Sequence, residues 1–187
     1  MLVNGTAAAV YYMSPTQISF QVPAGVSGTP TVQVTRDGLA SNTMSATAVS
    51  SAPGIFPVIV NGTNYAAGVF TDGTLVGDPS VSSAFRNAKP GDAIALFATG
   101  LAPSPAGSVV SVTQVSAVTV TIGGIPVTAS FAGLVAVGEF QINFTVPQQF
   151  ASMPAGNYPV TISISGVSSP STIASMPPGP VVIPIQP

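Results

Sequence analysis

The sequence contains no cysteine, no histidine and no tryptophan, and it has very few charged residues. Without thiolate or imidazole side chains, the chain has no Ser-His or Cys-His nucleophile and lacks the usual zinc ligands. A glycosidase needs two converging carboxylates, but the five acidic residues are scattered singly along the chain. We therefore predict that the protein is not an enzyme and has no catalytic residue, no cofactor and no required metal.

The acidic residues are better explained as parts of turns. Asp37, Asp72 and Asp92 each adjoin a glycine, a combination that is typical of tight turns. Asp72 and Asp78 could share a calcium ion through loop oxygens, although their spacing matches no EF-hand loop. Glu139 is expected at the start of a strand. Turn formation is the interpretation that we favour over metal binding.

The scarcity of charge also limits the partners of the protein. Only 4% of the residues are charged, against roughly 25% in a typical soluble domain. We expect packing into a polymer, or a coat of sugar, to shield such a surface. The net charge of −2, without a basic cluster, excludes binding to nucleic acid phosphates.

Two further patterns concern membranes and export. Ser, Thr, Gly or Pro interrupts every apolar run before it reaches about 18 residues, so we predict no membrane-spanning helix. The residues after Met1 lack the pattern of a signal peptide. If the protein is exported, we therefore expect this chain to be a mature or trimmed form.

Strand signals dominate the sequence, because Val, Ile, Thr and aromatic residues alternate with small polar ones between Gly, Pro, Asn and Asp. The turns Asp37-Gly38 and Gly123-Gly124 predict tight hairpins. The fold class is thus all-β. The clearest predicted strands are Ala7 to Tyr12, Thr16 to Val22, Thr31 to Arg36, Thr43 to Val49, Asp92 to Ala98, Ala117 to Ile122, Val127 to Phe131, Glu139 to Val146 and Tyr158 to Ser165.

An internal repeat relates the segment from Val3 to Asn42 to the segment from Ile122 to Pro170. In each copy a glycine turn leads to a strand of small residues, then to QISFQVP or QINFTVP, a Gly/Pro loop and a β-rich strand. We expect equivalent core residues in the two copies, namely Ile18, Phe20 and Val22 in the first and Ile142, Phe144 and Val146 in the second.

The two copies differ in what precedes them. The second follows PGDAIALFATGLAP, from Pro90 to Pro103, and an apolar run from Val109 to Val120. The first has no such lead-in, so we predict that its module lacks an initial strand. We divide the chain into an incomplete, strand-accepting module (1–52), a β-hairpin extension or linker (53–84), a C-terminal module (85–176) and an extended tail (177–187).

The segments PGDAIALFATGLAP, VTVTIGGIPVTASFAG and QINFTVP…GNYPVTISISGVSS resemble the IPT/TIG-type immunoglobulin-like domains of bacterial secreted and surface proteins. The resemblance covers Pro90 to Ser175, and Val3 to Val49 as a copy without its front end. It implies tandem β-sandwiches with a stalk, adhesion or assembly role outside the cell or on its surface.

Three sequons, at Asn4, Asn61 and Asn143, are candidate glycosylation sites. Asn4 and Asn61 precede glycine in expected turns, whereas Asn143 lies in a predicted strand. Ordinary turn and strand roles are the alternative at each site.

The C-terminal segment PVVIPIQP places Val181, Ile183 and Ile185 at strand period. We predict that these residues form a donor strand that completes the N-terminal module of the next chain, giving a head-to-tail homopolymer. The alternatives are a loose end or a tail that folds back onto its own chain. The predicted function is thus the structural subunit of an extracellular filament or surface matrix. The alternative is a stalk or adhesin module, with weak carbohydrate contacts through Tyr11, Tyr12 or Tyr65.

Overall fold

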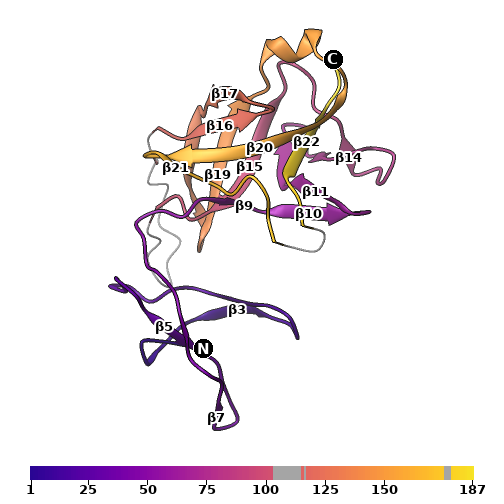
Figure 1. Cartoon of the computed structure of the whole chain (residues 1–187). Coiled ribbons are helices and arrows are strands. Elements are labelled where there is room, and N and C mark those ends of the chain that lie inside the picture. Colours follow the sequence, from indigo (N-terminus) through magenta and orange to yellow (C-terminus); the bar gives the residue numbers. More distant parts are fainter. Residues whose placement is uncertain (103–114, 116, 175–177) are drawn as a thin grey trace.

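A computed structural model describes residues 1–102, 115, 117–174 and 178–187. Its regular elements are strands apart from one short 3₁₀ helix, η1 (Gln148–Ser152), which confirms the predicted all-β fold class. Figure 1 shows a small body formed by the start of the chain and a larger body formed by the rest. We call residues 1–52 the N-terminal unit and residues 53–187 the C-terminal sandwich.

The C-terminal sandwich consists of two facing sheets. One has the order β10 (Pro57–Val60), β11 (Thr63–Ala66), β22 (Val181–Ile185), β20 (Gly156–Ile164), β16 (Thr119–Ile122) and β17 (Ile125–Thr128), with β21 (Val167–Ser168) also paired to β20. The other has the order β14 (Phe85–Arg86), β13 (Leu75–Val76), β12 (Gly68–Phe70), β15 (Ala93–Thr99), β19 (Glu139–Thr145) and β18 (Phe131–Ala136), with β9 (Gly54–Ile55) paired to β15.

The hydrophobic core fills the space between these sheets. Buried and less buried residues alternate along β15 and β19, because successive side chains of a strand point to opposite faces. Ile142, Phe144 and Val146 are at most 1% exposed, which confirms their predicted role as core residues. They belong to one cluster that also contains Ile122 and Ile183 from the facing sheet.

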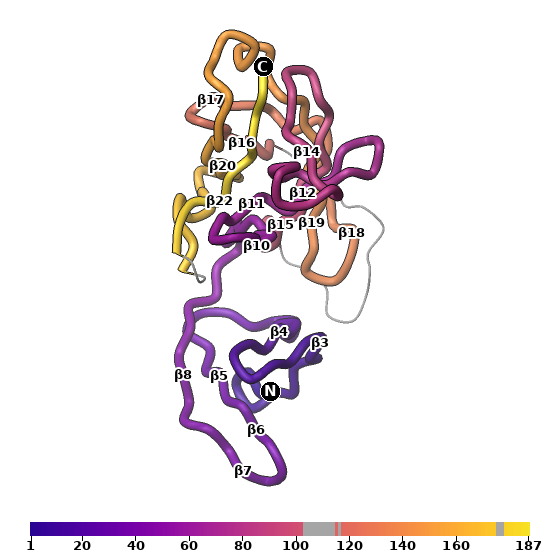
Figure 2. Tube along the Cα trace, turned by 90° about the vertical axis from the view of Figure 1, so that its right-hand side faces the viewer, coloured from indigo at the N-terminus to yellow at the C-terminus, as the bar shows by residue number. Residues whose placement is uncertain are grey.

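The N-terminal unit is built from smaller sheets. One has the order β2 (Thr6–Ala7), β1 (Leu2–Val3), β5 (Thr31–Gln33) and β8 (Met44–Ser45). The others are the two-stranded pairs β3 (Val10–Met13) with β4 (Ile18–Phe20), and β6 (Thr35–Arg36) with β7 (Leu39–Ala40). Figure 2 shows both β3 and β4 on the side of this unit that faces the C-terminal sandwich.

The N-terminal unit has almost no core of its own. Within residues 1–52, all of which the structure describes, only Val3 and Pro30 are buried. Ile18 and Phe20 are half-buried, and Val22 is 46% exposed, so their predicted core role is wrong. The physical reason is that β4 pairs with β3 alone among the described residues, whereas its counterpart β19 lies inside a larger sheet, between β15 and β18.

The predicted hairpin turns are confirmed. Asp37-Gly38 and Gly123-Gly124 have positive φ at both positions, as a type I′ turn requires. They join β6 to β7 and β16 to β17. Asn61-Gly62 makes the same turn between β10 and β11.

The two repeats share their strand pairing. The pairs β1–β5 and β3–β4 of the first copy correspond to β16–β20 and β18–β19 of the second. The hairpin β6–β7 corresponds to β20–β21, and β8, which pairs with β5, corresponds to β22, which pairs with β20. Two relations are not shared. β22 also pairs with β11, whereas β8 ends its sheet, and β19 has β15 on its other side, whereas among the described residues β4 pairs with β3 alone.

Several sequence-based boundaries are wrong. Residues 53–84 contain the β-hairpin β10–β11 of the predicted extension, but they do not link two modules, because β10 and β11 join one sheet of the sandwich and β12 and β13 join the other. The strand predicted from Val127 to Phe131 is instead the end of β17 and the start of β18, separated by a bend at Ser130. The apolar run from Val109 to Val120 lies largely outside the described residues.

Candidate strand-accepting edge

The side of β4 that faces away from β3 is the strongest candidate site in the described part of the chain. The carbonyl of Gln17 accepts a hydrogen bond from the Ser14 amide, and the Gln21 amide donates to the Ala9 carbonyl, so both residues face β3. Because backbone polar groups alternate in direction along an antiparallel strand, Ile18 and Phe20 face the opposite side. We call this side the open edge of β4.

A pocket lies alongside the open edge. It has a volume of about 320 Å³ and is lined by Ile18, Ser19, Phe20 and Gln21 from the β4 region, by Tyr11 of β3, and on the other side by Phe56, Thr99, Val137 and Gly138. Its walls therefore come from both bodies, and none of these residues is charged. The backbone edge of β4 thus borders an uncharged pocket.

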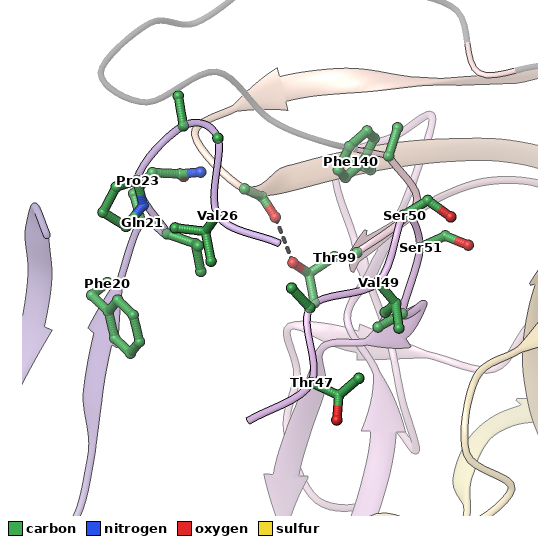
Figure 3. Close-up of a pocket in the computed structure, with 18 residues that line it drawn as sticks. Phe20, Gln21, Pro23, Val26, Thr47, Val49, Ser50, Ser51, Thr99 and Phe140 are labelled. Atoms are coloured by element: carbon green, nitrogen blue, oxygen red, sulfur yellow. Dashed lines mark hydrogen bonds between the residues drawn. The ribbon is translucent and has the colours of Figure 1, made fainter. Parts of the chain in front are cut away.

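A second, larger pocket continues from the first. Its volume is about 440 Å³, and Figure 3 shows Phe20, Val26, Thr99 and Phe140 around it. On the side of the C-terminal sandwich, the Thr99 hydroxyl donates to the Gly138 carbonyl at 2.8 Å. This bond joins the end of β15 to the turn that leads into β19.

The junction between the two bodies is anchored by backbone contacts. The amide of Ala52 donates to the carbonyl of Gly100 at 2.8 Å, and β9 pairs with the end of β15. Gly100 has a φ of +72°, and a Cβ built there would lie 1.9 Å from the Ala52 carbonyl oxygen. Only glycine fits this approach, so the chain leaves the N-terminal unit along a fixed path.

The exposed apolar side chains concentrate on the N-terminal unit. All of β3 is exposed, including Tyr11 at 56% and Met13 at 74%. Other large apolar residues exposed on this unit are Tyr12, Val22, Val34, Leu39, Met44 and Val49. An unsatisfied strand edge and a large apolar surface thus occur in the same small unit, which is the combination expected of an interaction site.

The C-terminal strand is not placed on the N-terminal unit. Instead, β22 lies in the C-terminal sandwich, where it pairs parallel with β11 and antiparallel with β20. Val181, Ile183 and Ile185 are at most 4% exposed there. In this chain the tail thus folds back, because the slot between β11 and β20 buries these residues fully, and their donation to the 1–49 module of another chain stays a prediction.

The carboxylates of Asp72, Asp78 and Asp92 are held by turns and by an arginine. Among the described residues, no three acidic side chains are grouped in a way that could hold a metal ion. Asp72 accepts hydrogen bonds from the hydroxyl and amide of Thr74, whereas Asp78 accepts from the amide of Ser80, so each closes its own turn. These hydrogen bonds lower the pKa of both carboxyls. The calcium alternative has no support in this geometry.

Arg86 forms ion pairs with two of these carboxylates. Its guanidinium binds Asp92 at 2.7 Å and Asp72 at 3.3 Å, and it stacks 3.4 Å from the centre of the Phe70 ring. Burial acts to lower the pKa of Arg86, but hydrogen bonding to Asp92 and the two carboxylate charges raise it overall. The cluster fastens β14 to the start of β15 and has a structural role.

The glycosylation candidates differ in accessibility. Asn61 is exposed at the tip of the β10–β11 hairpin, and Asn4 is exposed but accepts hydrogen bonds from the Thr31 amide and hydroxyl through Oδ1. Asn143 is half-buried in the middle of β19 and accepts from the Gln141 amide group. Of the tyrosines proposed for carbohydrate contacts, Tyr11 and Tyr12 are exposed, but Tyr65 is 3% exposed in the core.

Comparison with known proteins identifies the class of the first unit. Residues 1–52 match the sequence model of the IPT/TIG domain family, which confirms the resemblance for the N-terminal unit. No curated protein and no solved structure matches the chain. Domains of this class are generic structural or interaction modules with an immunoglobulin-like β-fold. No helix among the described residues is long and apolar enough to cross a membrane.

The open edge was only partly visible in the sequence. The repeat predicted that the two copies have equivalent strands, but the pattern could not say which strand lacks a neighbour. That information comes from the pairing of β19 with β15, together with the match between QISFQVP and QINFTVP. No local pattern indicates that the C-terminal strand lies beside β20.

Proposed function

We propose that this chain is a structural module of an extracellular stalk or surface matrix, which works by contact with neighbouring modules and not by catalysis. The observation that carries the proposal is the incomplete N-terminal unit, in which β4 has an open edge beside an uncharged pocket. A unit with so few buried residues gains its stability by joining another surface. β-Strand addition is the way in which a sheet edge does so.

The composition supports a location outside the cell. A surface with 4% charged residues is suited to a packed assembly, in which neighbouring modules cover the apolar area. Sugar attached to the exposed Asn61 would shield the C-terminal sandwich in the same way. The match to the IPT/TIG family over residues 1–52 agrees with such a role.

Immunogold labelling of intact and sectioned cells of the source organism tests this proposal. We expect antibodies against the folded chain to label material outside the cell envelope. As a matched control, the same antibodies are applied to cells in which the gene is deleted. Label confined to the cell interior would overturn the proposal.

A filament formed by copies of this chain alone is the second candidate function. The exposed row of β3 favours it, because an exposed apolar strand at a sheet edge can pair with a second copy. Light scattering of the purified chain between about 10 µM and 1 mM distinguishes the two candidates. Growth of particles that persist in about 1 M salt indicates self-assembly, whereas a constant mass of 18.5 kDa indicates a module that needs another partner.

A further inference from the structure

The C-terminal sandwich contains a natural template for what the open edge of β4 binds. There β15 pairs antiparallel with β19, and Ile94, Ala95 and Leu96 lie opposite Phe144, Asn143 and Ile142. The repeat equates Ile142 and Phe144 with Ile18 and Phe20. The comparison therefore predicts, residue by residue, the strand that would pair with β4 in the N-terminal unit.

We propose that the open edge of β4 binds an extended, uncharged strand of the β15 type, supplied from outside the described residues. This inference rests on the proposed function and names the partner of its site. The bound strand runs antiparallel to β4, with its Ile94 equivalent opposite Phe20 and its Leu96 equivalent opposite Ile18. The β15 strand of this chain is not itself available, because it is held between β12 and β19.

The backbone geometry of the template agrees with this register. The Val146 amide donates to the Asp92 carbonyl at 2.8 Å, and the Val146 carbonyl accepts from Gly91 at 2.9 Å. The backbone amide and carbonyl of Val146 therefore point toward β15. By alternation, those of Phe144 and Ile142 do so as well. Their equivalents Ile18 and Phe20 present the same backbone groups at the open edge of β4.

The opposite side of the template strand supplies the control. The Phe97 amide donates to the Ala67 carbonyl at 2.8 Å, away from β19. By alternation, the amides of Ile94 and Leu96 face β19. In the proposed complex the amide at the Leu96 position therefore bonds to β4, whereas the amide at the Phe97 position does not.

The side-chain chemistry of the partner follows from the same comparison. From Ala93 to Thr99 the template strand is uncharged, and its buried residues alternate with half-exposed ones. Both pockets beside β4 are also lined entirely by uncharged residues. We therefore expect the partner strand to be uncharged and apolar at alternate positions, and its binding to change little with salt.

The test uses the full chain, labelled with ¹⁵N, and a synthetic peptide of sequence PGDAIALFATGLA, which copies residues 90–102. We expect the amide signals of Ile18 and Phe20 to shift in NMR spectra as the peptide is added. N-methylation at the Leu96 position removes one ladder hydrogen bond and should weaken binding about tenfold. N-methylation at the Phe97 position should leave the affinity within about twofold.

The same readout applies when the peptide is joined ahead of Met1 through a flexible Gly/Ser linker, which removes any effect of peptide solubility. Equal affinity of the two methylated peptides, or unchanged signals of Ile18 and Phe20 in the joined form, would overturn the proposed partner. If surface labelling succeeds and this experiment fails, the chain is a structural module that joins its neighbours by another surface.

Discussion

Phe144 and Phe20 hold equivalent positions in the two repeats but have different surroundings. Phe144 is 1% exposed within the hydrophobic cluster, whereas Phe20 is half-buried beside the pocket at the open edge. We expect Phe144→Ala to lower the free energy of unfolding of the C-terminal sandwich by about 3 to 5 kcal/mol. Phe20→Ala should change it by less than about 0.5 kcal/mol. Urea unfolding followed by circular dichroism measures both, and equal losses would contradict the account.

Arg86 illustrates how a charged residue acts structurally in a chain with little charge. Arg86→Lys keeps the charge but loses the forked contact with Asp92 and the stacking on Phe70, so we expect a loss of about 1 to 2 kcal/mol in unfolding free energy. The matched control is Arg36→Lys, whose pair with Asp37 is almost fully exposed and should contribute nothing measurable. Losses of the same size in both variants would contradict a special role for Arg86.

The acidic turns imply a pH dependence with a definite sign. The Thr74 hydroxyl and amide lower the pKa of Asp72, and the Ser80 amide lowers that of Asp78. Because these folded-state pKa values lie below the unfolded ones, their stabilisation is complete above the unfolded value of about 3.9 and is lost as the pH falls through the folded values. We expect stability to fall with acid below about pH 4. Thermal melts of the wild type and of Asp72→Asn, which should show a smaller acid loss, check this sign.

At the scale of elements, β22 completes the C-terminal sandwich. Its five residues are buried between β11 and β20, and the carbonyl of Pro184 accepts from the Ala88 amide at 2.8 Å. Ile183→Asp places a charge in the core and should unfold the sandwich. Ile183→Val should cost only about 0.5 to 1.5 kcal/mol. A folded sandwich with Asp at this position, as measured by circular dichroism, would contradict this place for β22.

The strands and hairpins were the predictable part of the fold. Alternation in β15 and β19 and the Asn-Gly, Asp-Gly and Gly-Gly turns are local signals, which the sequence carries directly. The position of β22 was not predictable, because its pairing with β11 joins segments that lie far apart in the chain. An apolar strand at the end of a sequence has the same pattern whether it pairs with its own chain or with another.

The candidate site was predictable only as an absence. The repeat indicated that β4 and β19 are equivalent, and the pairing of β19 shows that a β15-type strand is the neighbour that β4 does not have among the described residues. The predicted burial of Phe20 is wrong for the same reason, because a side chain is buried only where neighbouring strands cover it. Local pattern thus describes what a side chain is suited to contact, and topology decides whether that contact exists.

On the scale of the whole molecule, the chain combines one complete sandwich with one incomplete unit. The buried cluster lies within residues 55–185, and the N-terminal unit contributes none of its members among the described residues. The larger body therefore has its own core, and the smaller body has almost none. A partner strand that paired with the first unit would add backbone hydrogen bonds and bury apolar side chains. This asymmetry between the two bodies therefore supports the proposed interaction role.

Amide hydrogen exchange at β4 tests this account most directly. In the chain alone, we expect Ser19, which faces β3, to exchange more slowly than Ile18 and Phe20, which face the open edge. When the PGDAIALFATGLA peptide is present in excess, Ile18 and Phe20 should become at least tenfold slower, while β19 should be unchanged. Amides of Ile18 and Phe20 that are already as protected as those of Ile142 and Phe144 without any partner would contradict the claim that β4 has an open edge.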